Sequence, residues 1–310
     1  MSKAKRLARH PIVRQVVKQT LPAWVAALTA YARLMRLDRP IGTWLLLWPT
    51  LWAVWLAADG RPKASTFVVF VLGVVLMRAA GCVINDWADR DLDPHVLRTR
   101  DRPIAAGEIA PRRALILFAL LLLAAFVLVL TQNPLTVKLA FVGAALAAVY
   151  PFMKRITHLP QLVLGAAFAW AVPMAYAATR GFVPREAWVL FTAALFWTTA
   201  YDTIYAMVDR ADDRRIGIRS TAILFGDLDR FVVGVLQAAF LLALVLIGRE
   251  ARLGPAYDWG VAVAAALLVW QQWSIRKRQP AACFEAFRNN NLVGLAVFAG
   301  IALDATFVSG

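Results

Sequence analysis

Long apolar runs recur along the whole sequence, and each is close to the length that crosses a lipid bilayer as a helix. A spanning helix needs about 20 mostly apolar residues. Nine runs approach or meet this length, at residues 41–58, 66–84, 113–131, 135–151, 160–178, 187–207, 230–248, 256–273 and 291–308. Turn-forming clusters such as Asp59-Gly60-Arg61-Pro62 separate them. The pattern predicts an all-α integral membrane protein with about nine transmembrane helices in one bundle.

Composition supports a membrane protein and argues against nucleic-acid binding. Hydrophobic residues make up 61% of the chain, whereas soluble domains hold about 45–50%. The formal charge of +15 could suit nucleic acid, but the basic residues lie in short segments between apolar runs, which membrane topology explains better. The two cysteines, Cys82 and Cys283, form no CxxC pair, so we expect neither a disulfide framework nor a thiolate metal site.

The placement of Lys and Arg predicts the orientation in the membrane. The N-terminal segment and the segments after the second, fourth, sixth and eighth runs hold most of these residues, whereas the other connections carry only pairs such as Arg61 and Lys63. Because cytoplasmic loops are enriched in Lys and Arg, we expect a cytoplasmic N-terminus and an external C-terminus. Residues 1–32 should form a basic cytoplasmic segment at the lipid surface, without a removable signal peptide, and residues 33–310 the membrane domain.

Two acidic stretches stand at the cytoplasmic ends of the second and sixth runs. In the first, Asn85, Asp89 and Asp93 are four residues apart, and Asp86 precedes Asp93 by seven, so a helix would place them on one face. In the second, the same spacing rule groups Asp202, Tyr205, Asp209 and Asp213. Carboxylates at the end of a membrane span are costly, which favours a functional role.

Two such faces opposite each other would form one cup of oxygen ligands. Many carboxylates tolerate one another only when cations are present. A ligand set without His or Cys favours Mg²⁺ over zinc or copper, and Mg²⁺ is usually shared with substrate phosphates. Solvated, inert acidic loops are the alternative, which the duplication at similar spacing disfavours. The candidate metal ligands are Asn85, Asp86, Asp89, Asp93, Asp202, Asp209 and Asp213.

Basic residues follow both stretches and would suit a diphosphate. They are Arg98, Arg100 and Arg102 after the first, Lys154 and Arg155 after Tyr150-Pro151, and Arg214, Arg215 and Arg219 after the second. Positive-inside topology alone would also place Lys and Arg here. Arg78 is different, because it lies inside the second run, seven residues before Asn85, where a charge indicates function.

These motifs together resemble those of one known family. Asn85–Asp93 fits the pattern NDxxDxxxD, and Asp202–Asp213 fits DxxYAMVDRxDD. Further matches follow in family order, namely Met35–Gly42, Arg98-Thr99 with Arg102-Pro103, Tyr150–Arg155 and Gly217–Thr221. The chain thus resembles the UbiA family of membrane-embedded aromatic prenyltransferases, most closely its bacterial members that act on 4-hydroxybenzoate. Two positions depart: Arg219 stands where a Lys is expected and keeps the charge, and Asp101 stands where an Asn is expected.

The resemblance implies a nine-helix bundle around a central cavity open to lipid, in the inner membrane of a bacterium. A polyprenyl diphosphate would place its headgroup on two Mg²⁺ ions between the acidic stretches, which face the cytoplasm. The catalytic residues would be Asp86, Asp89, Asp93, Asp202 and Asp209. Substrate-binding residues would be Asn85, Arg78, Arg98, Arg102, Tyr150, Lys154, Arg155, Tyr205 and Arg219, with Arg36 or Arg39 as partner of the acceptor's carboxylate.

The reaction implied is Mg²⁺-dependent transfer of the prenyl group to the ring carbon ortho to the hydroxyl of 4-hydroxybenzoate, in ubiquinone biosynthesis. The ring proton would leave to an Asp or to the departing diphosphate. Dihydroxynaphthoate, homogentisate or haem are alternative acceptors within the family. A cation-coupled transporter is the alternative of another class, against which the acidic stretches lie at the ends of the runs and not at the midplane.

Overall fold

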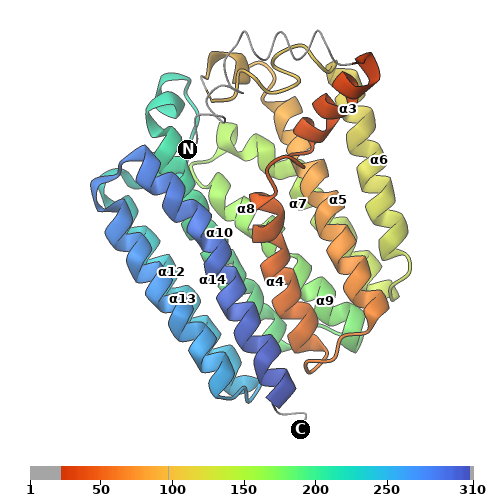
Figure 1. Ribbon diagram of the computed structural model, residues 1–310, viewed down its shortest axis with the longest axis vertical. Coiled ribbons are helices and arrows are strands. Elements are labelled where there is room, and N and C mark those ends of the chain that lie inside the picture. The colour runs from red at the N-terminus through yellow and green to blue at the C-terminus, as the bar shows by residue number, and fades with distance from the viewer. Residues whose placement is uncertain (1–21, 97, 308–310) are drawn as a thin grey trace.

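The computed structural model describes residues 22–96 and 98–307, which form helices and no strand. The long helices lie side by side in one bundle (Figure 1). They are α4 (Ile41–Ala57), α5 (Ala64–Ala88), α6 (Pro111–Val129), α7 (Pro134–Ile156), α8 (Pro160–Ala169), α9 (Ala171–Arg180), α10 (Arg185–Arg215), α12 (Asp229–Glu250), α13 (Pro255–Ser274) and α14 (Pro280–Phe307). Shorter elements are α3 (Ala23–Leu34), α11 (Thr221–Phe225) and the 3₁₀ turns η1 (Asp93–His95), η2 (Gly226–Leu228) and η3 (Ile275–Lys277). The all-α prediction is confirmed.

Each predicted apolar run coincides with one long helix, except that the run at 160–178 is divided into α8 and α9 at Trp170. Pro173 has no N–H for the carbonyl of Ala169, which accounts for a break at this point. Five helical stretches of the described chain are long and apolar enough to cross a membrane: Ala64–Ala88, Pro111–Val129, Pro134–Ile156, Pro160–Arg180 and Thr221–Glu250. Ile41–Ala57 is apolar but shorter. That the chain crosses the membrane nine times stays a prediction.

The helix that carries the second acidic stretch, α10, lies in the middle of the bundle and packs against α4, α8, α9, α12 and α14. Three buried aromatic rings hold it there. The ring of Trp197 lies 5.1 Å from that of Trp52 on α4 and 5.9 Å from that of Phe240 on α12. Large buried rings contribute strongly to packing energy. The position of the second acidic stretch is therefore set by the core.

A chain of buried amides joins α12, α13 and α14 to α10. Trp197 Nε1 donates to Asn290 Oδ1 at 2.9 Å, and Asn290 Nδ2 donates to Gln271 Oε1 at 3.4 Å. Gln237 Nε2 on α12 donates to the same Gln271 oxygen at 3.1 Å. Polar side chains inside a membrane bundle need such partners. These bonds fix the register of the three C-terminal helices.

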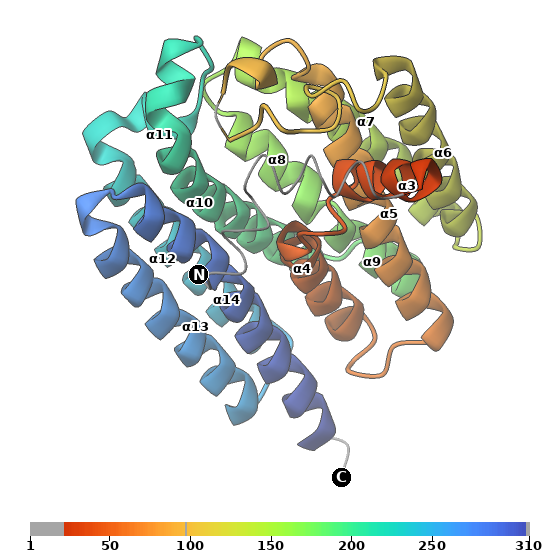
Figure 2. The same cartoon turned by 45° about the horizontal axis from the view of Figure 1, so that its top comes forward.

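One end of the bundle carries α3, the α5–α6 connection and α11 (top of Figure 1; Figure 2). Helix α3 lies across this end, with Ala30 and Leu34 buried against Val83, Ile104 and Ile109. It spans the predicted domain boundary between residues 32 and 33. The remainder of the predicted basic segment, residues 1–21, lies outside the described residues.

Candidate active site

The first acidic stretch lies where α5 ends. Asn85 and Asp86 occupy its last turn, Asp89 is the residue after the helix, and Asp93 opens η1. The prediction of one continuous helix through Asp93 is wrong. Helix α5 ends at Ala88, the chain turns at residues 89–92, and Asp93 then opens the 3₁₀ turn.

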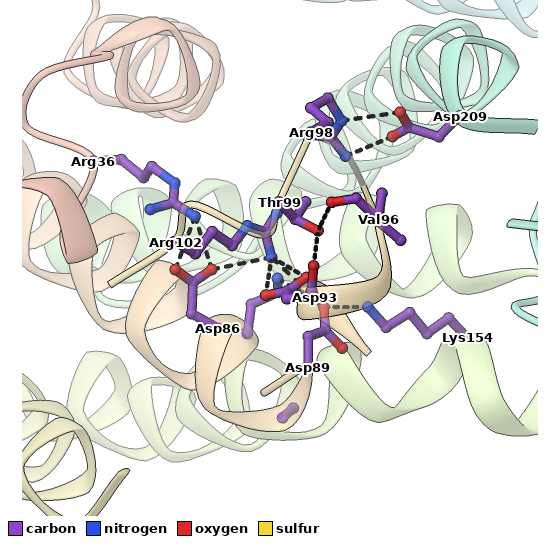
Figure 3. Close-up of polar contacts among 12 residues, drawn as sticks. Arg36, Asp86, Asp89, Asp93, Val96, Arg98, Thr99, Arg102, Lys154 and Asp209 are labelled. Carbon is purple, nitrogen blue, oxygen red and sulfur yellow. Dashed lines mark hydrogen bonds and ion pairs between the residues drawn. The ribbon is translucent and has the colours of Figure 1, made fainter. Parts of the chain in front are cut away.

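Asp86, Asp89 and Asp93 of this stretch nevertheless converge on one guanidinium nitrogen (Figure 3). Arg102 Nη1 lies 2.9 Å from Asp93 Oδ2, 3.2 Å from Asp86 Oδ1 and 3.8 Å from Asp89 Oδ2. All three aspartates are buried, Asp86 to 1% exposure. Arg36 Nη2 donates to both oxygens of Asp86, at 2.8 and 2.9 Å, and Lys154 pairs with Asp89. Every carboxylate of the first stretch thus has a cationic neighbour.

This crowding shifts the ionisation of the groups involved. Burial raises the pKa of Asp93 to about 6, with help from the charges of Asp89 and Asp86 and against the effect of Arg102. Burial alone would lower the pKa of Arg102, but the carboxylates of Asp86 and Asp93 outweigh it and raise that pKa. The three carboxylates therefore hold a positive charge firmly at the point where they meet.

The second stretch lies on α10, which continues as a helix through Arg215, so its predicted helical conformation is confirmed. Arg98 reaches it from the α5–α6 connection. Arg98 Nε and Nη2 donate to the two oxygens of Asp209 at 2.9 and 2.6 Å, and Nη1 donates to the Tyr205 hydroxyl at 2.7 Å. One turn further on, burial and the charge of Asp209 raise the pKa of Asp213 to about 7. Arg98 therefore ties the α5–α6 connection, which follows the first acidic stretch, to the second one.

The donor set suits a divalent cation, although the carboxylates are paired with Arg and Lys side chains. No three acidic, His or Cys side chains of the described chain lie close enough to hold one metal ion as they stand. A single positively charged nitrogen nevertheless lies among Asp86, Asp89 and Asp93. Asp89 Oδ1 is buried without a hydrogen bond. Oxygen ligands around a positive centre, with one oxygen to spare, fit Mg²⁺ chemistry.

The other predicted site residues differ in whether they contact the carboxylate cluster. Asn85 Nδ2 donates to Asp89 at 3.3 Å, and Arg155 donates to the carbonyl of Ala88. Arg219 Nη1 donates to the carbonyl of Ile156 at 2.6 Å, so its side chain holds the end of α7. Arg39 pairs with Asp38 at 3.5 Å, with 67% of its side chain exposed. The contacts of Arg39 and Arg219 thus lie with neighbours outside the carboxylate cluster.

The sequence and the fold of the chain match known proteins. The sequence model of the UbiA prenyltransferase family matches residues 46–295. The chain belongs to the UbiA prenyltransferase family. It is therefore an enzyme of the prenyltransferase class in a membrane fold.

Curated relatives and solved structures agree with this family. The chain is 58% identical to a 4-hydroxybenzoate octaprenyltransferase of Saccharophagus degradans over 90% of this chain and 93% of that protein. It is 57% identical to one of Marinobacter nauticus over 93% and 99%. The apo structure of a UbiA homolog from Aeropyrum pernix superposes with a TM-score of 0.76 at 25% identity, over 85% of this chain and 98% of that one. A UbiA homolog from Archaeoglobus fulgidus bound to GPP and Mg²⁺ shares the fold, with a TM-score of 0.65 at 18% identity over 88% and 99%.

This UbiA-family enzyme has an apolar cavity of about 430 Å³ beside the acidic site. Its walls come from α4 to α9, and Thr50, Arg78 and Tyr150 are among its few polar lining residues. Leu123 on α6 and Phe141 on α7 line the cavity and are also 58% and 61% exposed. The cavity therefore opens at the outer surface of the bundle between α6 and α7, in agreement with the predicted opening to lipid.

Arg78 lies in the wall of this cavity and forms no ion pair within 4 Å of a described carboxylate. Its guanidinium lies over Gly42, where any side chain would collide with it, and 6.0 Å from the ring of Phe168. Sequence reasoning missed both neighbours. Gly42 stands at the end of the matched Met35–Gly42 segment, which could have drawn attention to it, but Phe168 is indistinguishable from other apolar residues of its run.

Proposed function

We propose that this protein transfers a polyprenyl group from polyprenyl diphosphate to the ring carbon ortho to the hydroxyl of 4-hydroxybenzoate, with Mg²⁺, in ubiquinone biosynthesis. The observation that carries the proposal is the convergence of Asp86, Asp89 and Asp93 on one cationic centre beside an apolar cavity. The names of the relatives from Saccharophagus and Marinobacter support the acceptor. The Archaeoglobus homolog with GPP and Mg²⁺ supports the donor class and the metal.

The metal ligands in this proposal are Asn85, Asp86, Asp89, Asp93, Asp202, Asp209 and Asp213, which would hold two ions. Bound Mg²⁺ supplies positive charge that stabilises the diphosphate as it leaves. Arg98, Arg102 and Lys154 are within reach of the same carboxylates, so their charges can also bind the diphosphate. The cavity would take the isoprenoid chain and keep water away from the allylic carbon.

In the proposed reaction one bond breaks in the donor and one forms to the acceptor. The C–O bond between the allylic carbon and the diphosphate breaks, and the diphosphate leaves with the electron pair. The ring carbon of the acceptor bonds to the allylic cation, and the ring proton leaves to an aspartate or to the diphosphate.

The structure favours Arg78 as partner of the acceptor's carboxylate over the predicted Arg36 and Arg39. Arg36 is already engaged by both oxygens of Asp86, and Arg39 is exposed beside Asp38. Arg78 combines a free positive charge with a place in the wall of the cavity. A carboxylate bound there would leave the acceptor's ring in apolar surroundings close to the acidic site.

The predicted orientation places this site at the cytoplasmic face of a bacterial inner membrane. Both acidic stretches lie at the same end of the bundle as α3 (Figure 2). The soluble acceptor and the released diphosphate would enter and leave from this side. The cytoplasmic orientation follows from the distribution of Lys and Arg. The resemblance to bacterial enzymes supports the assignment to a bacterial membrane.

The test is prenyl transfer by purified enzyme with labelled polyprenyl diphosphate, 4-hydroxybenzoate and Mg²⁺. Asp86→Ala and Asp209→Ala should abolish product formation while the protein still inserts into the membrane, because each removes a proposed metal ligand. Asp91→Ala is the matched control, since its carboxylate lies in the same stretch with a side chain 77% exposed, and it should keep full activity. Near-normal turnover by either of the first two variants, or no transfer to 4-hydroxybenzoate by the unaltered enzyme, would overturn the proposal.

A further inference from the structure

A second buried ion-pair cluster, one carboxylate with two arginines, lies outside the proposed active site beside α10. Asp229, the first residue of α12, is fully buried and pairs with Arg210, which directly follows Asp209 in the second acidic stretch. Arg278 reaches the same carboxylate from the turn between α13 and α14, with Nη2 at 2.9 Å and Nε at 3.0 Å from Oδ1. One carboxylate thus joins α10, α12 and the α13–α14 turn.

The geometry around Asp229 leaves it little freedom. Its Oδ1 also accepts the backbone N–H of Arg230 at 2.6 Å. Arg278 itself is held by its Nη2, which donates to the carbonyl of Asp227 at 2.7 Å, and by a left-handed backbone with φ 51°. A buried carboxylate whose oxygens are filled in this way is held in one geometry, and it holds its partner Arg210 with it. Arg210 is therefore held in one direction by two elements outside α10.

The packing near Arg210 constrains this end of α10 less than the aromatic core constrains the helix at Trp197. The apolar cluster there combines Ile204 and Met207 with small side chains, among them Ala206 on α10, Ala222 on α11 and Ala286 on α14. Large buried rings contribute more packing energy than such side chains, so the ion pair adds a constraint on rotation that this cluster supplies only in part. Successive residues on an α-helix are about 100° apart, at 3.6 residues per turn, so the direction of Arg210 also sets that of Asp209 toward Arg98.

We propose that Asp229 is a positioning residue that orients the second acidic stretch through Arg210. Asp229 touches neither Arg98 nor the cavity, so it acts on the site only by fixing the rotation of α10. Its removal should leave the ligands of the second stretch present but misdirected. The inference rests on the proposed function, in which Asp209 helps to hold Mg²⁺.

The experiment compares Asp229→Asn with the unaltered enzyme in detergent. The first measurement is the Mg²⁺ concentration that gives half of the maximal thermal stabilisation, with inorganic diphosphate present, and the second is the initial rate of prenyl transfer. Loss of a group that orients a metal ligand typically costs about 10- to 100-fold in metal affinity or activity. We expect Asp229→Asn to raise the Mg²⁺ midpoint by about that factor and to lower the rate.

Two further variants separate this role from a general loss of charge. Asp227→Asn is the matched control, because Asp227 is exposed and contributes its backbone carbonyl to Arg278, and its Mg²⁺ midpoint should stay unchanged. Asp229→Glu keeps the charge and should recover most of the affinity. If Asp229→Asn does not fold, Arg278→Gln serves instead, since it keeps the Arg210–Asp229 pair and should raise the midpoint by a smaller factor.

The results that overturn the inference are distinct from those that overturn the proposed function. A folded Asp229→Asn with an unchanged Mg²⁺ midpoint overturns the inference. This includes the case in which Asp229→Asn yields less folded protein but the folded fraction binds Mg²⁺ normally. An unchanged midpoint in Arg278→Gln, where that variant is used, does the same. An unaltered enzyme that shows no Mg²⁺ response overturns the proposed function and the inference with it.

Discussion

Replacing Arg102 by Met tests whether its guanidinium holds the first acidic stretch together. Met is of similar length and carries no charge. Asp86 would keep Arg36 and Asp89 would keep Lys154, but Asp93 has Arg102 as its only ion-pair partner among the described residues. Removing one member of a buried pair costs about 3–5 kcal/mol when the remaining charge cannot be relieved. The change in stability should therefore be governed by Asp93.

Asp93 can relieve its charge by taking up a proton. Its pKa is already raised to about 6, and each further pKa unit costs about 1.4 kcal/mol. We therefore expect the free energy of unfolding of the metal-free variant to fall by about 1–3 kcal/mol at pH 7. Because folded Asp93 binds a proton that the unfolded chain releases, this loss should grow as the pH rises above 7.

The assay is denaturant unfolding in detergent without Mg²⁺, followed by tryptophan fluorescence at pH 6, 7 and 8. Arg100→Met is the matched control, because Arg100 is exposed and lies two residues away, and its stability should match that of the unaltered protein. Added Mg²⁺ should narrow the difference between Arg102→Met and the unaltered protein. Equal stability of the two, or a loss that shrinks as the pH rises, would refute this account of the cluster.

Two predictions concern the cavity. Gly73 lines it, and a Cβ added there meets no atom within 4 Å, so Gly73→Phe should fold normally yet occupy space for the prenyl chain. Excluding two methylene groups loses about 1.6 kcal/mol, so the KM for long-chain donors should rise by about tenfold or more relative to that for geranyl diphosphate; an unchanged ratio would place the chain elsewhere. Arg78→Gln should raise the KM for 4-hydroxybenzoate by roughly 10- to 100-fold, since a hydrogen bond to a charged group contributes about 1.5–3 kcal/mol, and leave the donor KM unchanged. A selective rise in the donor KM would instead assign Arg78 to the diphosphate.

Much of the fold could be predicted because a spanning segment must satisfy its backbone within itself, which leaves a run of apolar residues few options besides a helix. The failures lie where this constraint ends. Helix α3 is a 12-residue helix with only two buried residues, too short for the length rule that identified the others. The break at Trp170 was missed because α8 and α9 together still read as one apolar run.

The site was predictable in its residue types but not in its pairings. The spacing of Asp202, Tyr205 and Asp209 on one face needed only a continuous helix. The meeting of Asp86 and Asp93 depends on a turn that begins at Asp89, for which helix spacing is no guide. Arg98 and Asp209 are 111 residues apart in sequence, and a contact over that distance follows from packing, which a single sequence does not display.

The α5–α6 connection joins the two acidic stretches into one site. It supplies Asp93 and Arg102 to the first stretch and Arg98 to the second, and Ile104 and Ile109 fasten it to the bundle. Its two ionic contacts differ in exposure. Arg102 lies among carboxylates that are almost fully buried, whereas 41% of the Arg98 side chain is exposed, and solvent weakens the attraction between charges. The first half of the site is therefore assembled among buried groups without substrate, and the contact that joins it to the second half is the more solvent-exposed one.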